Sequence, residues 1–507
     1  MPVNDLTLSA HRRWPLRALF GWTMALCVAV CVWVMEARFS GLDITDTQIG
    51  DTPVTLYRTT GTAPLPPVLV AHGFGGSRQM MDQISVSLAR QGFLVASIDL
   101  IGHGRNGAQL SPDITRIEGT TQQLVAEVSR VAGALVARDD TAGPISFVGH
   151  SMSTDVVIRA AEARDDVGGV VAVSMYSPAV TASHPQAMLV VSGATEQHLR
   201  EAGLDAARQL DPAAIEGETV SRDGTTRRTS VAPYVGHVGV LYSPTSLNEI
   251  TTWLRTTTGE GRAADVDNTG WVSGVLLLCL ALLGWPLSKL LPRRFEEPAA
   301  EVPTRTFWIC LAAPIPLVLA AALLPKLGIA GYAAFGTLAL IFVIWGVTQL
   351  LILARGGIRF APRDAIGTLA YLAFGLGIFA VALDRYGAAF LPTGDRAIVL
   401  AGLLIGTIPL MLADTALTDG ASLWRRIVAR VALIFGLASA IAVAPTELGI
   451  AFTVVPVFVL FFVVYGTFGR WISARRGPGG IALGKAVALA WAVAASTPLF
   501  ATALTLP

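Results

Sequence analysis

Ser151 is the residue of this chain best placed by its neighbours to act as a nucleophile. It lies in Gly149-His-Ser-Met-Ser153, after an apolar run at 145–149 and before a helical pattern. On a sharp turn between a strand and a helix, a serine Oγ stands clear of the sheet edge, and the residues two before and two after it must be small. Gly149 and Ser153 meet that need, with a serine in place of the usual second glycine. A chain with 50 glycines matches so short a motif easily by chance, so its meaning depends on partners elsewhere.

A second motif offers stabilisation of an oxyanion. His72-Gly-Phe-Gly-Gly76 directly follows the apolar run at 67–72. Glycines let backbone N–H groups approach an oxygen on which negative charge develops. We expect the N–H groups of Phe74 and Met152 to be the two donors. One such donor contributes about 2.7–4 kcal/mol to the transition state.

A serine hydroxyl is a poor nucleophile near neutral pH and needs a histidine within hydrogen-bond reach. His237 follows the last predicted strand and precedes the last helix of the polar region, where a loop can bring it over the serine. We therefore expect His237 to be the base. Structural or surface roles are expected for the other histidines of this region: His72, His103, His150, His184 and His198.

A carboxylate must orient the histidine. It should lie between the serine and the histidine in the chain, at the end of the second strand after Ser151. That strand ends at 190–193, and the next acid is Glu196, with Asp205 and Asp211 as open alternatives. The four cysteines all lie in apolar runs, so no disulfide framework, metal site or cofactor is expected.

The elements that must position these residues form an alternating pattern. Short β-branched runs alternate with amphipathic helical stretches over residues 40–260, which predicts βαβ units and a mostly parallel sheet with helices on both faces. The predicted strands are 67–72, 93–99, 145–149, 169–175, 187–193 and 231–237.

Taken together, these motifs resemble the α/β-hydrolase superfamily, in particular its lipase, esterase and hydrolytic-peptidase branch. The matching segments are HGFGG (72–76), DLIGHGR (99–105), GHSMS (149–153), SGATE (192–196) and GHVGVLYSP (236–244). The resemblance implies that Ser151 is the nucleophile, Glu196 the acid and His237 the base, with Phe74 and Met152 as oxyanion donors. Glu196 replaces the commoner aspartate, so its longer side chain must fold back to reach His237. The segment 176–186 is too short for the helical lid that many members insert there.

The remaining segments of the chain are apolar enough to suit a lipid bilayer rather than water. Only 14% of the 507 residues are charged, and residues 271–503 are dominated by apolar side chains. Runs of about 20 apolar residues, enough to cross a membrane, predict an uncleaved anchor at 17–35 and an all-α bundle of about eight further spans. The predicted further spans are 271–291, 306–324, 330–353, 366–384, 397–414, 427–445, 449–468 and 484–503.

Lys and Arg set the expected orientation, because cytoplasmic loops carry an excess of them. They gather before residue 18 and in 289–305, 355–363, 425–430 and 470–485, whereas the opposite loops hold Lys326, Arg385 and Arg396. This pattern predicts a cytoplasmic N-terminus at 1–16 and places residues 40–260 on the outer face of the membrane, which we expect to be a bacterial plasma (inner) membrane. The middles of the eight later spans are expected to lack ionisable side chains, with Asp384, Asp414, Glu447 and Lys485 near span ends. This argues against an ion-coupled carrier.

The predicted function is that of a membrane-anchored serine hydrolase that cleaves an ester or related acyl bond. Its partners would be a small-molecule or lipid-like acyl substrate and membrane lipids, while a net charge of +1 argues against nucleic acid. Two alternatives remain open. One is an acyltransferase with the same triad, and the other is a membrane transporter or sensor with a non-catalytic hydrolase-like domain.

Overall fold

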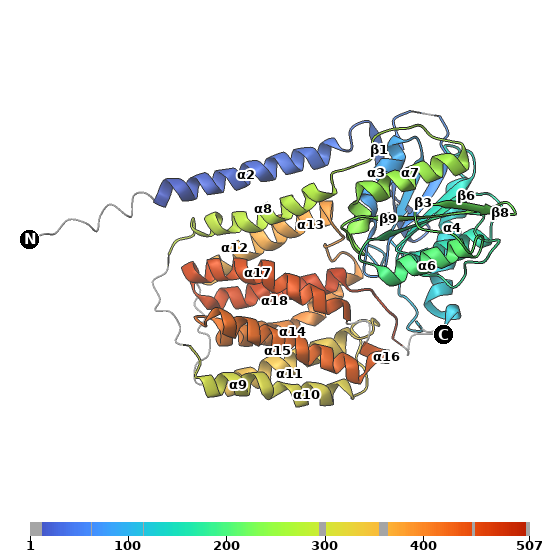
Figure 1. The fold of residues 1–507 in the computed structure, drawn as a ribbon. Coiled ribbons are helices and arrows are strands. Elements are labelled where there is room, and N and C mark those ends of the chain that lie inside the picture. The colour runs from blue at the N-terminus through green and yellow to red at the C-terminus, as the bar shows by residue number, and fades with distance from the viewer. Residues whose placement is uncertain are drawn as a thin grey trace, which may run out of the picture.

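The computed structural model describes residues 13–61, 63–114, 116–293, 301–353, 364–448 and 452–502. A domain built on a β-sheet sits at one end of a bundle of long helices (Figure 1). We call residues 38–267 the sheet domain, and the helix α2 (Arg13–Ala37) together with residues 268–502 the bundle. Residues 1–12 of the predicted cytoplasmic segment, the arginines of 355–363 and residue 503 lie outside the described residues.

The sheet of the described chain has nine strands in the order β1-β2-β4-β3-β5-β6-β7-β9-β8. Strands β4, β3, β5, β6, β7 and β9 run parallel, while β1, β2 and β8 add antiparallel edges. The strands are β1 (Leu42–Ile49), β2 (Thr52–Thr59), β3 (Pro67–Ala71), β4 (Leu94–Ile98), β5 (Ile145–His150), β6 (Val167–Val173), β7 (Ala187–Gly193), β8 (Thr219–Arg222) and β9 (Thr225–Ala232).

The central strands are buried on both faces, which explains their continuous apolar sequences. Every residue of β3, β4 and β5 is buried. Apolar side chains of α3 and α7 pack on one face of the sheet, and those of α4, α5 and α6 on the other. The helices of this domain are η1 (Arg78–Met81), α3 (Asp82–Arg90), η2 (Ile117–Thr121), α4 (Gln122–Val136), α5 (Met152–Glu162), α6 (Gln197–Arg208), η3 (Gly239–Tyr242) and α7 (Pro244–Thr258).

The last strand differs from its prediction. Strand β9 ends at Ala232, whereas the sequence pattern suggested 231–237. Pro233 cannot donate a ladder hydrogen bond, and Tyr234 has a positive φ of 63°. Residues 233–237 therefore turn away from the sheet and carry His237 over its edge. The edge strands β1, β2 and β8 were not predicted, because β1 and β8 in particular are polar and half exposed.

Nine helical segments of the described chain are long and apolar enough to cross a membrane, one for each predicted span. Two of them are composite: Pro314 separates α9 from α10, and η4 interrupts α12 and α13. The helices of the bundle after α2 are α8 (Gly270–Ser288), α9 (Thr304–Ala312), α10 (Pro314–Ala322), α11 (Phe335–Ile352), α12 (Asp364–Phe374), η4 (Gly375–Phe379), α13 (Ala380–Tyr386), α14 (Asp395–Thr418), α15 (Leu423–Val443), α16 (Pro445–Leu448), α17 (Val454–Arg476) and α18 (Pro478–Ser496).

The last span lies earlier in the chain than the hydropathy suggested. Helix α18 begins at Pro478 and ends at Ser496, instead of covering 484–503. The end has a local cause, because a residue that precedes proline is disfavoured in the helical region, and Thr497, before Pro498, is extended with ψ 133°. The expectation that Lys485 lies at a span end is therefore wrong. Its side chain is buried two turns inside α18.

Both chain connections to the bundle are fixed on the sheet domain. Arg38, just after α2, is buried and forms ion pairs with Asp82 of α3 at 2.8 Å and with Asp267, just before α8, at 3.3 Å. On the bundle side, Glu36 accepts hydrogen bonds from Arg385 at 3.0 and 3.1 Å. These contacts fix the two connections, and the Arg105–Asp384 ion pair of 2.7 Å holds the sheet domain itself against the end of the bundle (Figure 1).

Candidate active site

Ser151 occupies the turn between β5 and α5 in a strained backbone conformation. Its φ of 54° and ψ of −118° are unusual for a residue with a side chain. Such a turn exposes the side chain above the sheet but leaves little room beside it. A Cβ at Gly149 would lie 2.6 Å from the Ser153 carbonyl oxygen, and one at Gly73 would lie 3.0 Å from the Ser151 Cβ. Glycine at 149 and at 73 is therefore required by close approach.

Ser153 explains how the turn tolerates a serine where glycine is usual. The side chain is fully buried. Its Oγ accepts a hydrogen bond from the His150 N–H at 2.8 Å and donates to the Ala71 carbonyl at 2.7 Å. The hydroxyl thus ties the turn to the end of β3, the strand that carries the predicted oxyanion loop.

The structure brings Ser151, His237 and Glu196 together. His237 Nε2 lies 2.8 Å from Ser151 Oγ, and His237 Nδ1 lies 2.6 Å from Glu196 Oε1. A carboxylate accepts only, so Nδ1 carries the proton and Nε2 is left to accept the hydroxyl proton of Ser151. The His237 side chain is 46% exposed, while that of Glu196 is 6% exposed. The imidazole is accessible to a substrate, and its partner is shielded from water.

Glu196 is held in position to reach His237 by hydrogen bonds to its second carboxylate oxygen. Oε2 accepts hydrogen bonds from the Gly193 N–H at 2.6 Å and from the Ser174 hydroxyl at 2.8 Å. Partial burial raises the pKa of Glu196, but the hydrogen bonds from His237, Gly193 and Ser174 outweigh burial, and the net pKa is lowered. The carboxylate is thus ionised at neutral pH.

The two alternative acids lie elsewhere. Asp205 is on α6 and contacts Arg208 at 3.4 Å, and Asp211 accepts a hydrogen bond from the Ala213 N–H at 2.9 Å. Neither contact involves His237.

The predicted oxyanion donors flank the serine. Met152 is the first residue of α5, where backbone N–H groups have no helical acceptor. Phe74 follows β3 in the loop that passes beside Ser151. The Phe74 ring lies against His103 and stacks on Phe452 of the bundle, with ring centroids 5.8 Å apart and planes 14° apart.

Three further histidines near the site are buried and support its loops. His72 accepts the Leu100 N–H at Nε2 and donates from Nδ1 to the Gly73 carbonyl. Burial lowers the pKa of His103 to about 3 and that of His150 to about 4. His150 Nε2 is 2.9 Å from the His237 carbonyl oxygen and so helps to hold the loop of the base. His184 and His198 lie outside this cluster, and His198 is exposed.

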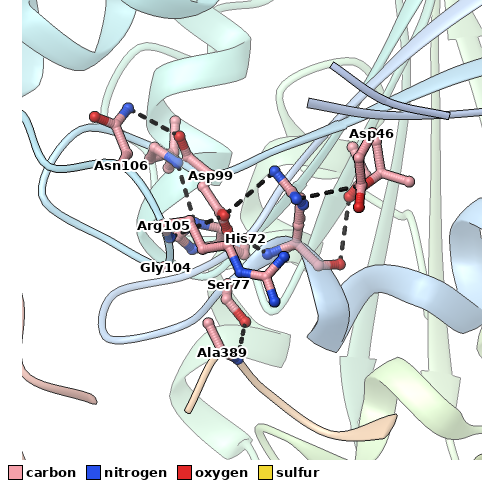
Figure 2. A network of polar contacts seen from close by, with 12 residues as sticks. Asp46, His72, Ser77, Asp99, Gly104, Arg105, Asn106 and Ala389 are labelled. Atoms are coloured by element: carbon pink, nitrogen blue, oxygen red, sulfur yellow. Dashed lines mark hydrogen bonds and ion pairs between the residues drawn. The ribbon is translucent and has the colours of Figure 1, made fainter. Parts of the chain in front are cut away.

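The loop that follows β4 links the site to the bundle. Asp99, fully buried, accepts hydrogen bonds from the Arg78 N–H at 2.9 Å and the Arg105 N–H at 3.0 Å (Figure 2). The loop so folded forms an ion pair of 2.7 Å between Arg105 and Asp384 of α13. Beside it, the Ala389 N–H donates to the Ser77 hydroxyl at 2.9 Å (Figure 2).

A single guanidinium from α14 completes this junction. Arg396 is buried and donates to the carbonyls of Gly102 and Gly104 at 2.9 Å. Its other nitrogen donates at 2.8 Å to the carbonyls of Ala494 and Thr497, at the end of α18. Arg396 of the bundle therefore holds the loop that follows β4 by hydrogen bonds. The same loop contains Leu100, whose N–H donates to His72 at the start of the oxyanion motif.

Part of the chain is similar to known proteins. Residues 62–235 match the family described as serine aminopeptidase, S33. The sheet domain has the α/β-hydrolase fold. Similar solved structures include a dienelactone hydrolase from Anabaena variabilis, with 20% identity over 42% of this chain and 94% of that one and a TM-score of 0.33. An esterase from Pyrobaculum calidifontis shares 13% identity over 47% and 92%, with a TM-score of 0.33. TT1662 from Thermus thermophilus shares 18% identity over 43% and 98%, with a TM-score of 0.31. No curated protein sequence matches the chain.

Sequence reasoning missed several residues around the candidate site. Ser174 was not singled out, although a small polar residue at the end of β6 is a signal that a strand end faces the site. Arg396 and Phe452 were missed for a different reason: they are more than 200 residues from Ser151 in sequence, and their contacts arise only from the docking of the bundle.

Proposed function

We propose that the protein is a serine hydrolase that cleaves an ester or related acyl bond through a covalent acyl-enzyme. The observation that supports this most is the hydrogen-bonded series Ser151–His237–Glu196, with distances of 2.8 and 2.6 Å. Its members lie at the carboxyl ends of parallel strands, where α/β proteins bind substrates.

The proposed reaction has two steps. In the first, His237 takes the Ser151 proton as Oγ attacks the acyl carbon, and the N–H groups of Phe74 and Met152 stabilise the oxyanion. His237 then gives that proton to the leaving alcohol or amine. In the second, water loses a proton to His237 and attacks the acyl-enzyme. As the acid leaves, His237 gives this proton to Ser151 Oγ, and the starting state is restored. The described residues supply every proton transfer in this sequence.

Labelling by a fluorophosphonate tests the proposal. This reagent phosphonylates an activated serine. The detergent-solubilised full-length protein is expected to label, whereas Ser151→Ala and His237→Ala are not. Ser246→Ala, a buried serine of α7 outside the site, is the matched control and should label like the wild type. A folded wild-type protein that fails to label would contradict an assembled nucleophile.

The proposed setting is a membrane, with the α/β-hydrolase domain on the outer face of a bacterial plasma membrane. Lys and Arg gather at the end of the bundle away from this domain, for example Lys289, Arg426 and Arg475, as expected for a cytoplasmic side. An impermeant thiol reagent on whole cells tests this orientation. Asp223→Cys, in an exposed turn of the domain, should be labelled, and Arg305→Cys should not.

The proposed substrate is lipid-like, because an aromatic side chain of the bundle adjoins the oxyanion loop. Phe452 is 57% exposed, lies two residues before α17, and stacks on Phe74. The loop 176–186 contains no helix that could serve as a lid. Phe452→Ala should therefore raise KM for long-chain esters more than for acetyl esters, and Phe435→Ala, an exposed phenylalanine on α15, should change neither. Product analysis with added alcohol acceptors would reveal an acyltransferase instead.

A further inference from the structure

A polar cavity lies in the half of the bundle farther from the α/β-hydrolase domain. It is about 70 Å³ in volume and is lined by residues of α14, α15, α17 and α18. Space for it comes from glycines of α17. A Cβ at Gly469 would lie 3.1 Å from the Lys485 Cε, and one at Gly466 would lie 3.7 Å from the Arg430 guanidinium nitrogens. Because about 10–15 Å³ of cavity volume is enough to hold one water molecule, the cavity has room for a small tetrahedral ion.

The ionisable residues around this cavity are unbalanced in charge. Lys485 and Arg430 share one carboxylate, Asp414, at 3.4 and 3.6 Å. Two further arginines, Arg426 and Arg470, line the same space. Asp414 lies behind the lining, whose one acid is Asp419, and Asp419 accepts a hydrogen bond from the Ser473 hydroxyl at 3.1 Å. Four cations thus face two carboxylates.

The position of the cavity makes this excess significant. The side chains of Lys485 and Asp414 are each 7% exposed, two turns and one turn inside their helices. Ionisable groups inside a membrane-spanning bundle are costly and usually mark a site of function. An internal ion pair accounts for Asp414, Lys485 and Arg430. It does not account for the half-buried Arg426 or the exposed Arg470, which line the same space.

The lining is suited to a phosphate group. Guanidinium groups bind phosphate oxygens through paired N–H donors, and the hydroxyls of Thr415 and Thr467 add short-range donors. Basic pockets between helices on the cytoplasmic side of a membrane bind anionic lipid headgroups. We propose that this cavity is a binding site for an anionic phosphate group, carried either by a phospholipid of the adjacent leaflet or by a soluble phosphate compound. The site is separate from the proposed hydrolase site and does not depend on it.

Thermal unfolding of the full-length protein in a non-ionic detergent tests this. The probes are inorganic phosphate, with sodium chloride at matched ionic strength as reference, and mixed micelles of phosphatidylglycerol, with phosphatidylcholine as reference because its choline cancels the phosphate charge. We expect a saturable rise in Tm with at least one of the two phosphate probes. Saturation by phosphate alone would indicate a soluble ligand, and saturation by phosphatidylglycerol alone would indicate a lipid headgroup.

Variants separate the site from general charge effects. Arg426→Gln and Arg470→Gln, which leave the Asp414 ion pairs intact, should each weaken the apparent affinity by about tenfold, the loss expected for one charge-assisted contact. Arg305→Gln removes the same charge from an exposed position of α9 outside the cavity and should leave the affinity unchanged. The proposal is overturned if neither probe raises Tm above its reference, or if the cavity variants respond like the wild type and Arg305→Gln.

Discussion

The substitution Glu196→Gln tests the orientation of the base more sharply than deletion of the side chain, because the structure predicts which way the amide will face. Oε2 of Glu196 accepts two hydrogen bonds, from Gly193 and Ser174, whereas Oε1 accepts one, from His237. A glutamine keeps the larger number of bonds by placing its carbonyl oxygen on the first side. Its NH₂ group then points at His237.

That orientation of the amide reverses the tautomer of the His237 imidazole. An NH₂ group donates, so His237 Nδ1 must become the acceptor and Nε2 must carry the proton. Nε2 then faces Ser151 as a donor and cannot take the hydroxyl proton. In a serine protease, the same wrong tautomer lowers kcat by about 10⁴-fold, which corresponds to about 5.4 kcal/mol of transition-state stabilisation. We expect a loss of this size in kcat for Glu196→Gln, with little change in KM.

Hydrolysis of a chromogenic ester by the full-length protein measures the effect. Glu201→Gln, one turn further along α6 and exposed, is the matched control and should retain full activity. Equal Tm values for the two variants and the wild type would show that folding is preserved. A loss of less than about tenfold, close to the value of one ordinary hydrogen bond, would refute the role of Glu196 in orienting His237.

Three other perturbations have expected outcomes. Ser174→Ala removes one hydrogen bond to Glu196, worth about 1.4 kcal/mol, so kcat should fall about tenfold and KM should not; an unchanged kcat would contradict this. Arg396→Gln leaves buried carbonyls at the junction unpaired, which costs about 3 kcal/mol and should lower the Tm of the full-length protein; an unaltered Tm would refute the account of the junction. Burial lowers the pKa of His103 to about 3 from an ordinary 6.5, so below pH 6.5 the unfolded chain binds a proton that the folded chain does not. The free energy of unfolding should therefore fall by about 1.4 kcal/mol for each unit of decreasing pH. His103→Gln should make the decline of Tm between pH 6.5 and 4 shallower, and exposed His198→Gln should not; equal slopes would contradict this.

Residues of the site could be predicted where their positions follow from the order of strands. Ser151, Glu196 and His237 each follow a strand that the periodicity marks, and parallel strands bring their carboxyl ends to one edge. The side chains that hold them could not be predicted in the same way. Ser174 acts on Glu196 through a backbone conformation with a φ of 54° that nothing in the sequence indicates.

Span prediction from hydropathy located nine segments but not their ends. Apolar runs fix the middle of a span, whereas its ends depend on local stops such as Pro478 and Pro498 around α18. An error of six residues at the start of α18 was enough to move Lys485 from the expected end of a span to a buried position two turns inside the helix. The contacts between α14 and the α/β-hydrolase domain depend on how two parts of the chain that are distant in sequence dock, which no local pattern encodes.

The segment that follows α18 places a constraint on how the protein is made. Phe500 is 1% exposed and belongs to the hydrophobic core of the α/β-hydrolase domain. Its neighbours form backbone hydrogen bonds with Leu110: the Leu110 N–H donates to Leu499, and the Ala501 N–H donates to Leu110. The core of the domain therefore cannot be completed until Phe500 is translated, roughly 240 residues after α7. At 5–20 residues per second, the synthesis of this stretch takes about 12–48 s. During that interval the emerging domain lacks part of its core, which is completed only after α18 has been synthesised. A chain that loses its final segment would thus leave the ribosome with every proposed catalytic residue present and the fold around them unfinished.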